Sequence, residues 1–517
     1  MQKVPTAFCS AGFPTPSTPL RNLKRNHKKA QDAIFYSYTK YINGFAADLE
    51  EEEAMEMSSA WPESESFKDE GMGPIPPKWK GICQNDTDKG VRCNRSDHYV
   101  IIIDLTADAD ALRRKLIGLR YFNKGYGSAV GAVGLAAETP RDTDGHGTHT
   151  LSTAAGRFVP GANVFGLGNG TAKGGAPNAR VAAYKVCWPP VNGSECFDAD
   201  ILAAFDEAIH DGVHVLSVSL GGGPTDYFKD GVAIGSFHAV KHGITVVCSA
   251  GNSGPESGTV SNTAPWIVTV GANTMDRDKL CLKRSLDPEK VRGKIVVCLR
   301  GENARVEKGE VVHQAGGIGM VLANDESTGN EIIADAHVLP ATHISYDDGL
   351  AILLHLNSSN YGSGHVQPNR AMDPGLVYDL TTNDYLNFLC ALGYNSTQIA
   401  TFSTEPYVCP SKPLKIEDLN YPSITIPNLS GASTITRMIK NVGLPSTYKV
   451  HVEEPAGVSV TVKPRKLKFK KLGEEKKFTV ALKDKRSNLA REYTFGGLTW
   501  SDGKHYVRSP IVVKVAH

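Results

Sequence analysis

The sequence lacks a surplus of either charge, a long hydrophobic run and the C-x2-C spacing of zinc modules. Its 517 residues include 56 Lys and Arg against 55 Asp and Glu, which leaves a formal net charge of +1. A near-neutral chain is not expected to hold nucleic acid or an anionic membrane by bulk charge. No apolar run approaches the roughly 18 residues that span a bilayer. We therefore expect no nucleic-acid partner, no membrane partner, no metal and no cofactor.

The N-terminus lacks the apolar segment of a secretory signal. Residues 1–5 are Met-Gln-Lys-Val-Pro, and residues 1–30 as a whole are rich in Pro, Ser and Lys. This composition predicts an unstructured start and no signal peptide in this chain.

The cysteines indicate an oxidising compartment, in tension with that N-terminus. Eight of the ten cysteines form close pairs, and each pair closes a short loop rich in Asn, Gly, Asp or Pro. Such spacing favours disulfide bonds over metal binding. The expected pairs are Cys83/Cys93, Cys187/Cys196, Cys281/Cys298 and Cys390/Cys409. Seven N-x-S/T sequons support the same compartment as glycosylation candidates: Asn85, Asn94, Asn169, Asn192, Asn357, Asn395 and Asn428.

Residues 180–272 alternate between buried-strand runs and amphipathic helices. Strands are expected at 180–187, 213–220, 244–250 and 266–270. Asp200 is expected to cap a helix that Gly212 ends, and a second helix is expected over 231–242. Continuous apolar strands joined by helices predict a parallel sheet covered on both faces, which is an α/β fold.

The two remaining regions have different patterns. Residues 275–360 repeat the strand–helix alternation on a smaller scale. From about residue 418 the apolar period becomes two, with turns between the runs, which predicts a β-sandwich of roughly 100 residues.

Three local strings carry polar groups suited to chemistry. Residues 142–156 place His146 and His149 at a Gly-flanked helix start, and Ser219, Leu220 and Gly221 follow a strand whose backbone is suited to pairing with an extended peptide. Asn252 follows the next strand, where its amide is placed to donate to an oxyanion. The alternatives are ordinary turns, satisfied histidines, or a metal pair of both histidines with Asp142 or Asp144.

Together the three strings resemble the plant subtilisin-like serine proteases (subtilases, cucumisin-like). Residues 142–156 are similar to the family's histidine motif, 219–221 to its S1-side substrate strand, and 250–254 to its oxyanion motif. The resemblance implies acyl transfer through a serine nucleophile, with His146 as general base and Asn252 as oxyanion donor. It also implies extended peptide substrates, the chain's own partial propeptide as a partner, and an extracellular location.

The resemblance implies a domain order along the chain. Residues 1–30 are unstructured, 31–57 are a partial inhibitor-type propeptide, and 58–274 are the first part of an incomplete peptidase core. Residues 275–360 resemble a protease-associated insert, 361–410 the last part of the core, and 411–517 a fibronectin-III-like sandwich. Residues 96–114 interrupt the core as an atypical insertion.

Two departures from the family pattern concern its catalytic residues. Met57 stands at the place of the family's Asp, and a thioether cannot accept the imidazole Nδ1–H. The family's Gly-Thr-Ser nucleophile motif occurs nowhere in the chain. Asp104, at the end of an apolar run in the insertion, is an alternative candidate for the missing Asp, but its strand would have to enter the sheet from the wrong place in the sequence. We therefore expect an inactive chain, or alternatively a non-catalytic pseudoenzyme that binds peptides or proteases.

Overall fold

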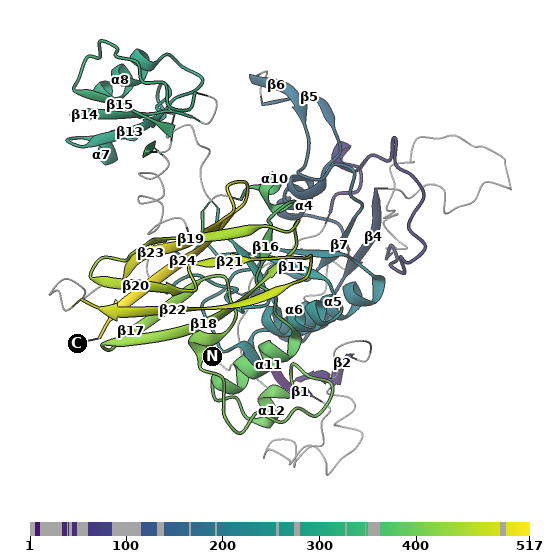
Figure 1. Cartoon of the computed structure of the whole chain (residues 1–517). Coiled ribbons are helices and arrows are strands. Elements are labelled where there is room, and N and C mark those ends of the chain that lie inside the picture. Colours follow the sequence, from purple (N-terminus) through teal and green to yellow (C-terminus); the bar gives the residue numbers. More distant parts are fainter. Residues whose placement is uncertain are drawn as a thin grey trace. The chain divides into compact units, whose positions relative to one another are not determined.

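The chain folds as two compact units, shown as a ribbon in Figure 1. One unit contains Met1–Val270 and Thr381–Leu414, and the other contains Gly271–Leu380 and Lys415–His517. The structure is a computed structural model that describes residues 6–10, 34–38, 40, 44–48, 60–84, 115–131, 139–164, 167–191, 194–254, 258–272, 280–325, 328–346, 348–349, 362–364, 366–485 and 493–516. In these ranges, no helix has both the length and the apolar character required to cross a bilayer.

The first unit contains the predicted parallel strands, so the α/β class is confirmed. They form two separate sheets. One sheet pairs β4 (Leu116–Tyr121) with β7 (Val181–Lys185). The other has the order β10-β11-β12, with β10 at Val215–Val218, β11 at Thr245–Ser249 and β12 at Val268–Val270. All four strands expected between 180 and 272 are present, each shorter than predicted.

Helices α5 (Asp198–Asp211) and α6 (Gly231–Lys241) pack against each other beside these sheets (Figure 1). Gly212 ends α5 in the left-handed conformation, as expected. The prediction that Asp200 caps α5 is wrong, because Phe197 occupies that position. Asp200 is instead buried in the first turn of α5, and its carboxylate accepts the backbone N–H groups of Gly125 and Tyr126, each at 2.9 Å. These N–H groups start α3 (Lys124–Val130), so the carboxylate joins two helices.

One face of the β10–β12 sheet is exposed among the described residues. Val215 at 57%, Val268 at 51% and Val270 at 38% are among the exposed large apolar side chains. Parallel strands usually have both faces covered, and their sequences are then continuous apolar runs. These valines belong to such runs. This face of the sheet therefore carries apolar residues typical of a protein core, although they are exposed to solvent.

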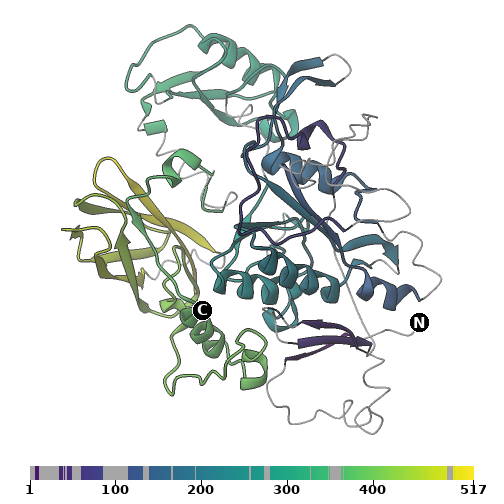
Figure 2. The same ribbon diagram turned by 90° about the vertical axis from the view of Figure 1, so that its right-hand side faces the viewer.

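The N-terminal strands form a small antiparallel sheet in the order β1-β3-β2. Its strands are β1 (Thr6–Ser10), β2 (Ile34–Tyr38) and β3 (Gly44–Asp48). β2 packs against α5, as the purple strands beside the helices show in Figure 2. The unstructured prediction for residues 1–30 is wrong at β1, because that segment pairs its backbone with β3.

Shorter elements complete the first unit. They are α4 (His146–Ala155), β5 (Val159–Val164), β6 (Leu167–Ala172), β8 (Cys187–Val191), β9 (Ser194–Cys196), α11 (Thr382–Ala391) and α12 (Ser396–Ile399). Three predicted disulfides are confirmed. Cys187–Cys196 and Cys390–Cys409 lie within the first unit, and Cys281–Cys298 lies within the second. The fourth prediction involves Cys93, which lies outside the described residues.

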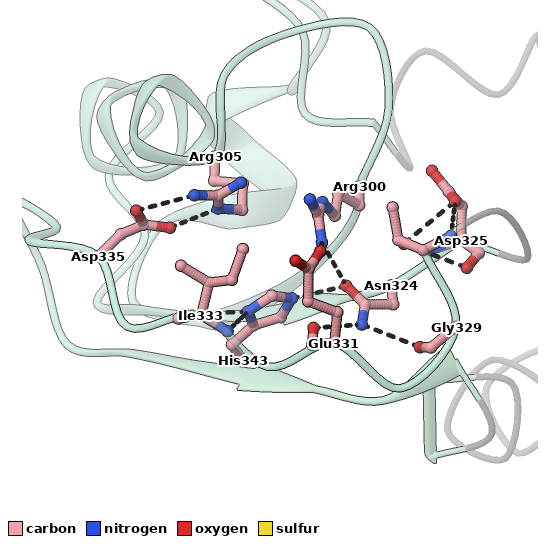
Figure 3. A network of polar contacts seen from close by, with 10 residues as sticks. Arg300, Arg305, Asn324, Asp325, Gly329, Glu331, Ile333, Asp335 and His343 are labelled. Carbon is pink, nitrogen blue, oxygen red and sulfur yellow. Dashed lines mark hydrogen bonds and ion pairs between the residues drawn. The ribbon is translucent and has the colours of Figure 1, made fainter.

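The second unit contains a small parallel sheet in the order β13-β14-β15. Its elements are α7 (Pro288–Val291), β13 (Ile295–Leu299), α8 (Arg305–Gln314), β14 (Gly319–Ala323) and β15 (Ala341–Ile344). Asn324, directly after β14, is buried and organises the polar contacts drawn in Figure 3. Its side chain donates to the carbonyls of Gly329 at 2.9 Å and Glu331 at 2.7 Å, and its Oδ1 lies 2.7 Å from Nε2 of His343. The network fixes the loop between β14 and β15.

The β-sandwich predicted from residue 418 is confirmed. One sheet has the order β16-β18-β22-β20 and the other β17-β24-β23-β19-β21. Their bounds are β16 Leu376–Val377, β17 Ile424–Leu429, β18 Ala432–Asn441, β19 Thr447–Glu453, β20 Val458–Lys463, β21 Lys466–Lys468, β22 Glu475–Asp484, β23 Thr494–Ser501 and β24 Tyr506–Val515. Alternate residues such as Val458, Val460 and Val462 are buried in its core. β16, which follows α10 (Pro368–Ala371), comes from the stretch 361–410 and pairs with β18.

Candidate active site

Helix α4 begins at His146, so the imidazole is placed at a helix start as predicted. Gly145 precedes it with a φ of 100°, a left-handed conformation that favours glycine. The helix start is held by Asp142, whose buried carboxylate accepts the backbone N–H groups of Asp144 at 3.2 Å, Gly145 at 2.8 Å and Thr148 at 2.7 Å. The Thr148 hydroxyl donates to the same carboxylate at 2.7 Å. Asp142 therefore acts as an anion bound at the N-terminus of α4.

These contacts set the ionisation of Asp142. Burial alone raises the pKa of this carboxyl group, but the hydrogen bonds from Thr148 and the backbone outweigh burial and lower the pKa below 3.8. An ionised carboxylate engaged by four donors has little capacity left for a metal ion. His149 is exposed, and within the described ranges no three His, Cys, Asp or Glu side chains gather as a metal site.

His146 has an unusual environment for a general base. Its Nδ1 is buried and has no hydrogen-bond partner among the residues that the structure describes. In a catalytic triad this nitrogen donates to a carboxylate, which fixes the tautomer that leaves Nε2 free to accept a proton. Nothing in the described ranges performs that task for His146.

The loops that carry Ser219 to Gly221 and Asn252 meet at one edge of the three-stranded sheet. β10 and β11 run parallel with Val218 opposite Cys248, so both loops leave at the same edge. They approach so closely that a Cβ added to Gly221 would lie 2.9 Å from Cα of Gly251. Leu220 is buried, whereas Asn252 is exposed to solvent.

Asn262 holds these two loops together, a role that the sequence did not reveal. Its side-chain amide donates to the carbonyl of Leu220 at 2.6 Å and to that of Ser249 at 2.8 Å. Asn262 has a φ of 55°, which few residues other than glycine adopt, and Asn tolerates it better than most. A Ser-Asn-Thr string in a loop is a weak signal, so only the structure identifies this residue.

A cavity of about 550 Å³ lies between the helix of His146 and strand β10. Its walls include Gly147 and Thr150 of α4, residues 181–184 of β7, and the stretch from Val215 to Ser219. The structure thus brings the His146 helix and Ser219 to one cavity, while Asn252 lies along the neighbouring loop.

Several predicted site residues lie outside the described ranges. These are Met57, Asp104, Asn85, Asn94, Asn192 and Asn357. The remaining sequons, at Asn169, Asn395 and Asn428, are exposed. Exposure is the condition that glycosylation requires, so these three stay candidates.

Comparisons with known proteins match the chain over nearly its whole length. The family models are "Subtilase family" over residues 103–438, "Peptidase inhibitor I9" over 15–60 and "Fibronectin type-III domain" over 418–513. Among similar proteins of Arabidopsis thaliana, subtilisin-like protease SBT5.3 is 41% identical, covering 95% of this chain and 92% of that protein. SBT5.4 is 40% identical, with 96% and 91% covered, and SBT1.7 is 38% identical, with 88% and 81% covered.

The matched region of SBT5.3 is longer than this chain. The two chains are matched over 725 residues, although this chain has only 517. The relative therefore carries long stretches, within the matched region, that have no counterpart here.

Proposed function

Since the chain belongs to the subtilase family, the subtilisin-like serine endopeptidases, we propose that this member has lost the family's proteolytic activity. In this proposal His146 stands at the position of the general base and Asn252 at that of the oxyanion donor. Ser219, Leu220 and Gly221 form the substrate strand. Met57 replaces the orienting Asp, and the nucleophilic serine is absent.

The observation that carries the proposal is the buried Nδ1 of His146, which has no hydrogen-bond partner among the described residues. An imidazole with no acceptor at Nδ1 has no fixed tautomer, so it is a poor base even where a serine is present. The absence of any Gly-Thr-Ser string and the longer matched region of the relatives support the same conclusion. Loss of the serine in subtilisin, a member of the same family, lowers kcat by about 10⁶-fold, and we adopt that magnitude.

A fluorophosphonate probe tests the proposal, because its reaction requires a serine activated by a neighbouring base. The chain, its His146→Ala variant and the Arabidopsis relative SBT5.3 are labelled side by side. We expect labelling of SBT5.3 and none of either form of this chain. Labelling of the chain that disappears in His146→Ala would refute the proposal.

A second candidate function is a pseudoenzyme that binds extended peptides or another protease. The geometry around Leu220 favours it, because Asn262 and Ser249 both hold the Leu220 carbonyl and so fix the strand end. This candidate requires a folded protein. Purified chain that melts without a cooperative transition would exclude it.

The family relationship also supports proposals for the other segments. We assign residues 31–57 to a partial inhibitory propeptide and 275–360 to a protease-associated domain. The three confirmed disulfides support an extracellular location, since disulfides persist in oxidising compartments. Mass spectrometry of the protein purified from its native tissue, with and without glycosidase, tests location and glycosylation together.

A further inference from the structure

The charge of the chain is unevenly distributed. Residues 418–513, which match the fibronectin type-III model, contain 17 Lys and Arg but only 8 Asp and Glu, a net charge of +9. The other residues contain 39 Lys and Arg against 47 Asp and Glu, a net charge of −8. The near-neutral total therefore combines a basic sandwich with an acidic remainder, and such asymmetry indicates an anionic partner for the basic part.

Cations gather on the outward face of the five-stranded sheet. Tyr448, Val450 and Trp500 are buried in the core of the sandwich, so the residues that alternate with them point outward. The outward positions hold basic side chains from three strands: Lys449 and His451 of β19, Lys466 and Lys468 of β21, and Arg508 of β24. We call these five residues the basic face. The strands that carry them are labelled in Figure 1.

The strand register places these side chains next to one another. Lys449 lies directly opposite Lys466. On the strand between β19 and β24, Thr499 lies between His451 and Arg508. Side chains directly opposite each other on paired strands have Cβ atoms about 5 Å apart, and like charges in that arrangement destabilise a sheet.

The basic face has almost no counter-charge of its own. Among the described residues, no carboxylate forms an ion pair with Lys449 or Lys466, whereas Lys440 and Lys476 of the same sandwich each pair with one. Glu453, at the end of β19, is the one acidic side chain at an outward position of the described strands of this sheet. The repulsion on this face is therefore available for relief by an external anion.

Protection of a sheet edge does not explain the arrangement. Lysines on edge strands prevent pairing with other chains, and β21 is an edge strand. However, β19 and β24 lie inside the sheet, and Lys449 and Arg508 extend the basic face across them.

The chemistry of the face fits a sugar polymer that carries carboxylates. Hydroxyl groups lie between the cations, at Thr447, Thr499 and Ser501. Cations pair with the carboxylates of an acidic polysaccharide, and hydroxyls pair with its sugar hydroxyls. The choice of a polysaccharide over nucleic acid rests on the extracellular location proposed above, which the disulfides support.

We propose that the basic face of the β-sandwich binds a linear acidic polysaccharide through the carboxylates of its sugar rings. Lys449 and Lys466 are the central pair, because a carboxylate between them relieves their repulsion. The proposal concerns the sandwich alone, so it stands whether or not the chain is catalytic.

A fluorescein-labelled oligogalacturonate is the probe, long enough to cross four strands spaced about 4.8 Å apart. Fluorescence anisotropy with the full chain in calcium-free buffer is the measurement. We expect saturable binding that weakens at least tenfold between about 50 and 200 mM NaCl, because the contacts are ionic. The methyl-esterified oligomer, which lacks the charges, is expected to bind at least tenfold more weakly than the acid.

A matched pair of double variants locates the binding. Lys449→Gln/Lys466→Gln removes two charges from the basic face. Lys463→Gln/Lys477→Gln removes two charges from exposed outward positions of the other sheet, where neither lysine lies opposite another cation. We expect the first variant to weaken binding at least tenfold and the second less than threefold.

Melting of each variant separates binding from folding. Since Lys449 and Lys466 repel each other, their replacement should leave the melting temperature unchanged or raise it. Absence of saturable binding, equal losses in the two double variants, or equal binding of the methyl ester would overturn the proposal. Tighter binding of double-stranded DNA or of phosphatidylserine vesicles than of the oligogalacturonate would overturn it as well.

Discussion

Replacement of Asp142 by Ala should loosen the start of α4, where His146 lies. The carboxylate is buried and accepts three backbone N–H groups and one hydroxyl. A hydrogen bond to a charged group contributes about 1.5–3 kcal/mol, and loss of a helix cap costs about 0.5–2 kcal/mol. These contributions overlap and burial of the charge offsets part of them, so we expect a loss of about 2–4 kcal/mol.

Urea unfolding followed by circular dichroism measures this loss, with Asp144→Ala as the matched control. Asp144 is exposed, so its replacement should change the free energy of unfolding by less than about 0.5 kcal/mol. The lowered pKa of Asp142 predicts a contribution that is complete above pH 3.8 and disappears as the pH falls through the folded-state value. Asp142→Asn should therefore flatten the acid limb of the stability profile. Equal midpoints for Asp142→Ala and Asp144→Ala would refute the reasoning.

Three further predictions concern the rest of the chain. Burial lowers the pKa of Lys115 from 10.5 to about 8, so stability should rise between about pH 8 and 10.5, and Lys115→Met should remove that rise in unfolding titrations. Joint replacement of Cys187 and Cys196 by Ala should lower stability by about 2–3 kcal/mol, because their disulfide closes a short loop; unchanged melting would contradict this. Asn324→Ala leaves Nε2 of His343 and two carbonyls without their partner, so calorimetry should show a loss of about 1–3 kcal/mol, and a loss under 0.5 kcal/mol would count against the network.

Apolar periodicity predicted most of the fold. The strands around β7, β10 and β11 are continuous apolar runs, and the sandwich alternates with a period of two, so each pattern has one structural interpretation. The local sequence pattern gave wrong predictions where a contact with a residue distant in the sequence determines the structure. β1 forms because β3 lies beside it, and Asp200 binds the start of α3 rather than its own helix.

The candidate site was predictable to the extent that it is local. The helix start at His146 and the loop at Asn252 follow from their own strings. The roles of Asp142 and Asn262 depend on hydrogen bonds across the fold, which no single string contains. The cavity lined by β7 and β10 could not be predicted, because a run of apolar residues predicts a strand but not which of its edges is paired.

The proposed loss of peptide-bond hydrolysis is tested by a turnover measurement. Hydrolysis of a fluorogenic peptide library is measured for the chain and for His146→Ala at equal concentration. We expect the same kcat/KM for both, at the background rate, because the chain has no Gly-Thr-Ser string and Nδ1 of His146 has no acceptor among the described residues. A rate for the unchanged chain at least tenfold above that of His146→Ala would contradict it.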